Sequence, residues 1–170
     1  MKKTRDADES CPCPPHRSSA GFLLAQVGAH AASKFAERLA KLNLVPSDAG
    51  ILRIVGSTPA ITQQALANTL GIVPSRLVSL IDDLESRELI ERRDNPDDRR
   101  SYALHMTGKG RSTLEAIGRV AREHQQALLA ALSEEEQRQL AALLQRVVDE
   151  QGLTPGVHPG LRSVGRPERQ

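Results

Sequence analysis

Arginines with short polar neighbours stand at two places in the chain where they could contact a large polyanion. Arg76 lies between Ser75 and Ser79. Short side chains of this kind let a backbone approach a groove closely, while a guanidinium reaches a base edge or a phosphate. Arg99 and Arg100 follow a run of turn-forming residues. A solvated charged surface is the alternative for this second pair, but both groups suit binding chemistry.

Residues suited to catalysis or metal binding form no convincing constellation. Cys11 and Cys13 stand near His16 in a proline-rich stretch. Their spacing differs from that of structural zinc sites, and one short cluster supplies too few ligands. His105 and His124 have no neighbouring nucleophile in the sequence, and no glycine-rich phosphate loop is present. We therefore predict no catalytic residues, no cofactor and no metal site.

Length and composition narrow the possible classes of protein. The chain has 170 residues and a formal net charge of +2, with a pI of about 8.7. Any nucleic-acid contact must then come from locally placed arginines and not from a global field. Aromatic residues make up 2% of the chain, so the core must be aliphatic. Neither a membrane-spanning apolar run nor a signal peptide is visible, and we expect a cytoplasmic protein without membrane contact.

Two short helices separated by a tight turn must position Arg76. Thr62 can cap the first helix, and Gly71 suits the left-handed position just beyond its end. Pro74 can open the second helix, where its missing N–H costs nothing. The second helix has one apolar stripe at helical spacing, made of Leu77, Leu80, Ile81 and Leu84. Acidic residues follow in its later turns, so only its first turns can face phosphates.

A hairpin with a charged tip follows these helices. Residues Leu89–Arg93 and Tyr102–Met106 can pair as strands, and turn formers connect them. The order helix, turn, helix and hairpin indicates a winged helix-turn-helix, in which the hairpin is the wing. We predict a mainly α fold with a small β-hairpin wing, flanked by dimerisation helices.

The flanking segments complete the expected organisation. Apolar periodicity predicts long helices over 20–42 and 107–132, and Ser133 with Glu136 forms a capping box for a last helix. Ser47 is the predicted N-cap of a short helix near residues 51–55, and 59–61 is a predicted edge strand. The predicted units are a disordered tail at 1–19, a domain at 20–150 with its DNA-reading part at 58–106, and a flexible tail at 151–170.

Several motifs resemble the MarR family of bacterial transcription regulators. The matching segments are Ala65–Ala67, Leu70–Ile72, Leu84–Arg92, the wing Asp94–Ser101 and Leu104–Gly110. The Asp-x-Arg pattern of the family's wing falls on Asp98 and Arg100. The resemblance covers 21–150, and the wing followed by Thr-x-x-Gly is its most specific part. Val73 departs from the pattern, because many members have a capping Ser or Thr there.

The resemblance implies a sequence-specific DNA-binding regulator, homodimeric, acting as a repressor that a small aromatic or phenolic effector releases. The apolar faces of the first and last helices favour a second copy as partner, and a two-fold protein matches a near-palindromic double-stranded operator. Repression and activation stay open from the residues alone. A winged helix used only for protein–protein contact is the alternative function. Expected DNA contacts are Thr62, Gln63, Ser75, Arg76, Ser79, Arg93, Arg99 and Arg100, with Asp98 orienting an arginine of the wing.

Overall fold

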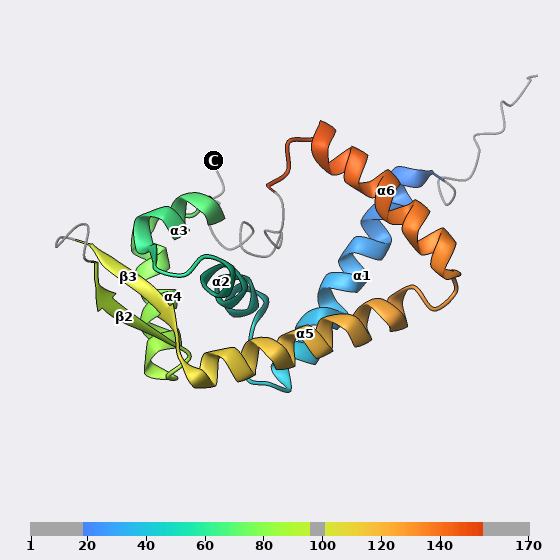
Figure 1. Cartoon of the computed structure of the whole chain (residues 1–170). Helices are drawn as coiled ribbons and strands as arrows, with labels where there is room; N and C mark the ends of the chain where they lie inside the picture. The colour runs from blue at the N-terminus through green and yellow to red at the C-terminus, as the bar shows by residue number, and fades with distance from the viewer. Residues whose placement is uncertain (1–18, 96–100, 155–170) are drawn as a thin grey trace, which may run out of the picture.

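The computed structural model describes residues 19–95 and 101–154. Within these ranges helices dominate and one small sheet is present, which confirms the predicted fold class (Figure 1). The elements are α1 (Ala20–Ala40), α2 (Pro46–Ser57), β1 (Ile61–Thr62), α3 (Gln63–Leu70), α4 (Pro74–Ser86), β2 (Ile90–Asp94), β3 (Tyr102–Met106), α5 (Gly108–Leu128) and α6 (Glu134–Glu150). The predicted tails fall almost entirely outside the described residues.

The sheet has the antiparallel order β1-β3-β2. In the β2–β3 hairpin, Ile90 is opposite Met106 and Asp94 is opposite Tyr102. The first wing strand thus begins one residue later than predicted. The predicted edge strand at 59–61 is wrong for its first two residues. Ala60 has a φ of 61°, and the Ile61 N–H donates to the Thr58 carbonyl, so this segment is a turn before β1.

Local capping residues explain where most helices begin. The Thr62 hydroxyl accepts from the Ala65 N–H at 3.2 Å, as predicted. Gly71 adopts the predicted left-handed conformation, with a φ of 65°. Ser47 is not the N-cap of α2, because Pro46 already occupies the first helical position, for which its fixed φ is suited. Instead, the Asp48 carboxylate accepts from the Val45 N–H at 3.2 Å.

The core is aliphatic, as the composition predicted, and it lies mainly in the winged part of the molecule. It consists mostly of leucine, isoleucine and valine side chains from α1, α2, α3, α4 and the sheet. The fully buried members are Leu39, Ile51, Leu52, Val55, Leu66, Leu70, Leu77, Ile81, Leu84, Ile90 and Leu104. This core fixes the orientation of α3 and α4, the two helices that carry the candidate DNA contacts.

A short motif connects the wing to α5. The Thr107 hydroxyl donates to the Glu88 carbonyl oxygen at 2.6 Å and accepts from the Gly110 N–H at 2.9 Å. Thr107 therefore caps α5, as predicted, and also ties this helix to the chain leading into β2. Gly110 packs directly against the Leu89 carbonyl, where a Cβ atom would lie only 1.9 Å from the oxygen.

Helices α1, α5 and α6 extend away from the sheet (Figure 1). Helix α5 ends at Leu128, earlier than predicted, and Gln137 donates to the carbonyl oxygens of Leu129 and Leu132 in the following turn. The predicted capping box of α6 is present, since Ser133 N–H donates to the Glu136 carboxylate at 2.8 Å. No residue of α6 is buried in the single chain. The exposed apolar residues of these helices include Phe22, Leu24, Val27, Leu143 and Val147.

Candidate nucleic-acid interface

The first two turns of α4 present the polar residues singled out from the sequence. Ser75 and Ser79 are exposed and Arg76 is half-buried, while Leu77 on the opposite side is 1% exposed. The buried stripe therefore turns the serines outward. Val73 is the N-cap of α4 and offers no side-chain hydrogen bond. The start of α4 is thus free of a capping side chain that would stand between its backbone and a ligand.

Acidic residues in the later turns of α4 form ion pairs with arginines. Asp83 accepts from Arg87 at 3.0 Å. Asp82 accepts from Arg92 Nη2 at 2.5 Å, and Glu85 pairs with Arg92 Nη1. The sequence had indicated that these carboxylates would repel phosphates. In the structure their charges are partly compensated, which lowers this repulsion beside a DNA backbone.

Arg92, which was not among the predicted site residues, joins three elements of the winged part. Its backbone N–H donates to Glu85 Oε1 at 2.9 Å, so one carboxylate contacts both its backbone and its side chain. Its guanidinium also reaches the amide of Gln63 at the start of α3. The sequence carried only a weak signal for this role, because the partners are 7, 10 and 29 residues away in the chain.

The remaining predicted DNA contacts belong to the start of α3 and the wing, and some of them fall outside the described residues. Thr62 uses its hydroxyl oxygen to cap α3, which leaves the hydroxyl proton able to donate. Arg93 is exposed on β2 and its Nε donates to Glu91 at 2.9 Å. Asn95 donates to the Ser101 hydroxyl at 3.1 Å across the base of the wing turn. The predicted contacts Arg99 and Arg100, together with Asp98, lie outside the described residues.

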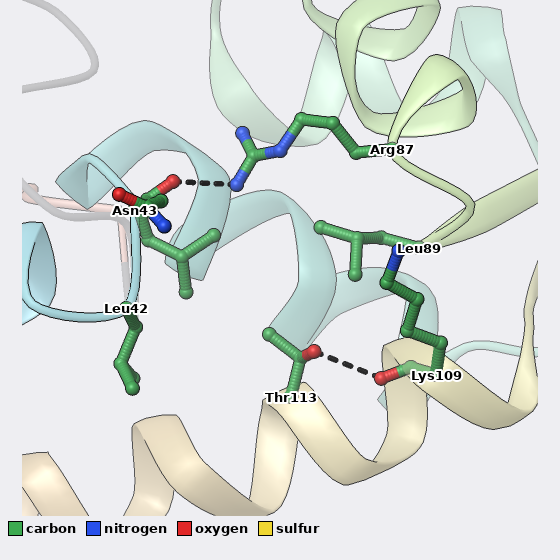
Figure 2. A pocket seen from close by; sticks show the side chains of 7 residues that line it. Leu42, Asn43, Arg87, Leu89, Lys109 and Thr113 are labelled. Atoms are coloured by element: carbon green, nitrogen blue, oxygen red, sulfur yellow. Dashed lines mark hydrogen bonds between the residues drawn. The ribbon is translucent and has the colours of Figure 1, made fainter.

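A cavity of about 260 Å³ lies where the α1–α2 turn, the end of α4 and the start of α5 meet (Figure 2). Arg87 crosses one side of it and donates from Nη2 to the Asn43 carbonyl oxygen at 2.6 Å. Its Nη1 donates to the buried Asp48 at 3.2 Å. Burial opposes the charge on Arg87, but the hydrogen bonds with Asp83 and Asp48 outweigh it and raise its pKa. Arg87 therefore connects the end of α4 to α2 and to the turn that precedes it.

A second hollow, of about 380 Å³, lies between α1 and α5. Small residues of α1 line it, and the rings of Phe35 and His124 face it with centroids 5.4 Å apart. Burial lowers the pKa of His124, and the positive charge of Arg38 adds to this effect, with a smaller contribution from His30. The hollow is thus mostly apolar, with one aromatic pair.

Other kinds of site find no support in the described residues. No cluster of three or more His, Cys, Asp or Glu residues within 19–95 and 101–154 could hold a metal ion. Cys11, Cys13 and His16 lie outside these ranges. No helix among the residues described is both long and apolar enough to cross a membrane.

Comparison with known proteins agrees with the winged helix-turn-helix arrangement described above. Residues 44–102 match the family model described as MarR family. A protein of Thauera aromatica, named as a transcriptional regulatory protein for the hcr operon, is 34% identical over 112 residues, covering 66% of this chain and 68% of its own length. The HTH-type transcriptional repressor Rv2887 of Mycobacterium tuberculosis is 24% identical over 127 residues, covering 75% and 91%.

Solved structures of similar proteins bound to DNA also resemble this chain. The transcriptional repressor CouR bound to a 23-mer DNA duplex has a TM-score of 0.69 at 29% identity, covering 78% of this chain and 94% of that chain. A mutant of MarR from E. coli complexed with operator DNA has a TM-score of 0.65 at 25% identity, covering 75% and 92%. Both resemble this chain over nearly their whole length.

Proposed function

The chain belongs to the MarR family of DNA-binding transcriptional regulators, and we propose that it acts as a homodimeric repressor on a near-palindromic operator. One observation carries this proposal. The first two turns of α4 present Ser75, Arg76 and Ser79. On the other side of the helix Leu77, Ile81 and Leu84 are buried, so the core holds this small polar surface in a fixed orientation. In a helix-turn-helix protein the start of this helix contacts the base edges in the major groove.

The wing supplies the second DNA contact in this proposal. Arg93 lies on β2, and Arg99 and Arg100 fall in the turn predicted from the sequence, outside the described residues. A guanidinium at such a tip can enter a narrow minor groove, where the negative potential is strongest. Asp98 would orient one of these arginines by a bidentate hydrogen bond and not contact DNA itself. Thr62 and Gln63, at the start of α3, would donate hydrogen bonds to the DNA backbone.

Dimerisation is supported by the unpartnered apolar surface of α1 and α6. Phe22, Leu24 and Val27 on α1 are 46–48% exposed, and Leu143 and Val147 on α6 are 56% and 47% exposed. Large exposed apolar surface on helices is typical of an interface. A second copy is the simplest partner, because the two-fold axis of a homodimer then coincides with that of a palindromic operator.

Release by a small aromatic or phenolic effector is part of the same proposal. The hollow beside Phe35 and His124 and the cavity beside Arg87 both lie where α5 meets other elements. A ligand there could alter the angle between the flanking helices and the winged part. Since the relatives are transcriptional regulators, we also infer that the chain has no enzymatic activity and works in the cytoplasm, beside its DNA target.

A gel-shift titration tests this function. The full-length protein is titrated against a duplex from upstream of its own gene, at two salt concentrations, with an unrelated duplex as the control. We expect tighter binding to the upstream duplex and weaker binding of both at higher salt. Hydroxybenzoate then serves as the effector probe and should weaken the specific complex. Equal affinity for both duplexes at either salt concentration would instead favour a protein–protein interaction module.

A further inference from the structure

Gln63 and Arg92 form a contact between the start of α3 and the first strand of the wing. The amide oxygen of Gln63, in the orientation that its partners require, accepts from Arg92 Nε at 2.7 Å and from Nη2 at 3.1 Å. A glutamine amide has one acceptor end and one donor end. Because the oxygen faces the guanidinium, the NH₂ group must point away from it.

The guanidinium is itself held from the other side by α4. Glu85 contacts Nη1, and Asp82 accepts from Nη2 at 2.5 Å. The side chain of Arg92 is only 18% exposed. The planar guanidinium is therefore fixed by β2, α3 and α4 together, and it can impose a single orientation on the Gln63 amide.

The charges around Arg92 argue against a direct role as a counterion for DNA. Two carboxylates, from Asp82 and Glu85, contact this one guanidinium. Gln63, by contrast, is the first residue of α3, the helix that crosses the DNA backbone in helix-turn-helix proteins. The amide NH₂ group can only donate, and phosphate oxygens can only accept.

We propose that Arg92 is a positioning residue for operator binding, which holds the Gln63 amide so that its Nε2 donates to a phosphate oxygen. The proposal rests on the proposed function, since it assumes that α3 lies against DNA. It adds a reason why this glutamine is effective. A free glutamine loses rotamer entropy when it binds, whereas a preoriented amide has already lost it on folding.

A double-mutant cycle on full-length protein tests the coupling. The affinity for the operator is measured for wild type, Gln63→Ala, Arg92→Lys and the double variant. We expect Gln63→Ala to weaken binding about tenfold, as for the loss of one hydrogen bond to a charged group. Arg92→Lys keeps the positive charge but loses the planar guanidinium that donates to Gln63 from two nitrogens. It should therefore cause a similar loss of affinity for the operator. The double variant should bind no more weakly than the weaker single variant.

The neighbouring Gln64 provides the matched control. Its Nε2 donates to Asn68 Oδ1 at 3.1 Å, on the same helix, so the effects of Gln64→Ala and Arg92→Lys should multiply. The salt dependence of binding should stay unchanged in Gln63→Ala and Arg92→Lys, because neither changes a charge. The proposal would be overturned if the losses of affinity in Gln63→Ala and Arg92→Lys also multiplied in the double variant. Wild-type affinity in Gln63→Ala would overturn it too.

A second variant keeps the test valid if Arg92→Lys unfolds. Gln63→Glu retains an acceptor for Arg92 but replaces the donor with a carboxylate that phosphate repels. It should melt no lower than wild type and bind the operator more weakly than Gln63→Ala. Affinity equal to wild type in Gln63→Glu would refute the donor role. If the wild type binds its operator but the losses in Gln63→Ala and Arg92→Lys multiply, only this inference is refuted. If the wild type binds no operator, the proposed function is refuted.

Discussion

Substitution of Arg76 tests most directly whether the start of α4 contacts DNA, as we propose. If it forms a bidentate contact to a base, Arg76→Ala should cost about 1–3 kcal/mol of binding free energy and relax the base preference at one position. The measurement is affinity for the operator and for single-base variants of it. Arg138→Ala on α6 is the control, because it removes the same charge from an exposed residue that already pairs with Glu135. Unchanged affinity and base preference in Arg76→Ala would assign this face another role.

Single residues were predictable from the sequence where their partners are close along the chain. Thr62 and Ser133 act as helix caps because a hydroxyl reaches a backbone N–H three residues later. Arg87 and Arg92 were not predictable in this way. Arg87 contacts Asp48, 39 residues away, and the folded arrangement of α2 and α4 alone brings the two together. Charge pairs across elements follow from tertiary packing, which the sequence pattern does not specify.

At the scale of an element, the close packing of α5 against the wing depends on Gly110. A Cβ atom at this position would lie 1.9 Å from the Leu89 carbonyl oxygen and 2.7 Å from the Met106 sulfur. Gly110→Ala should therefore lower the free energy of unfolding by about 1–3 kcal/mol or more, as expected for overpacking. Denaturant unfolding measures this change.

Gly108 gives a matched control in the same motif. A Cβ atom there meets nothing within 4 Å. Gly108→Ala should leave stability unchanged or slightly higher, because alanine loses less backbone entropy than glycine in a helix. Equal stability of Gly110→Ala and Gly108→Ala would contradict the close contact between α5 and Leu89.

The packing of α5 on α1 should make stability depend on pH through His124. Burial, together with Arg38, lowers the pKa of His124 from 6.5 in the folded state. Between the lowered pKa and 6.5 the unfolded chain binds more protons, so the free energy of unfolding must fall as the pH decreases through this window. His124→Gln should reduce this slope in denaturant titrations at fixed protein concentration. An identical slope in wild type and His124→Gln would show that His124 is not responsible.

Elements were predicted more accurately than their ends. The turn glycine Gly71 and the proline Pro74 marked the limits of α3 and α4 correctly, because each suits one backbone conformation. The edge strand and the end of α5 were misplaced, since apolar residues continue past the point where the backbone turns. Ile61 and Leu132 fit an apolar pattern without revealing where the regular hydrogen bonds begin or stop.

At the scale of the whole molecule, α6 distinguishes a monomer from a dimer. It contributes no buried residue to its own chain, so in a monomer its removal should cost little. If α6 forms the interface, truncation after Leu132 should leave an aggregating or unfolded chain, as judged by light scattering and circular dichroism. Truncation after Thr154 is the control and should remain dimeric. A stable, soluble monomer from the Leu132 truncation would argue against the dimer.

The most direct test of a two-fold regulator is a footprint on its own upstream DNA. Two recognition helices related by a dyad enter successive major grooves, so two protected half-sites should be related by a palindrome, with centres about 10 bp apart. Destroying one half-site should weaken binding strongly, because the dimer then has only one specific contact surface. A single asymmetric protected site, bound equally well after either half is altered, would contradict a homodimer that reads both halves with α4.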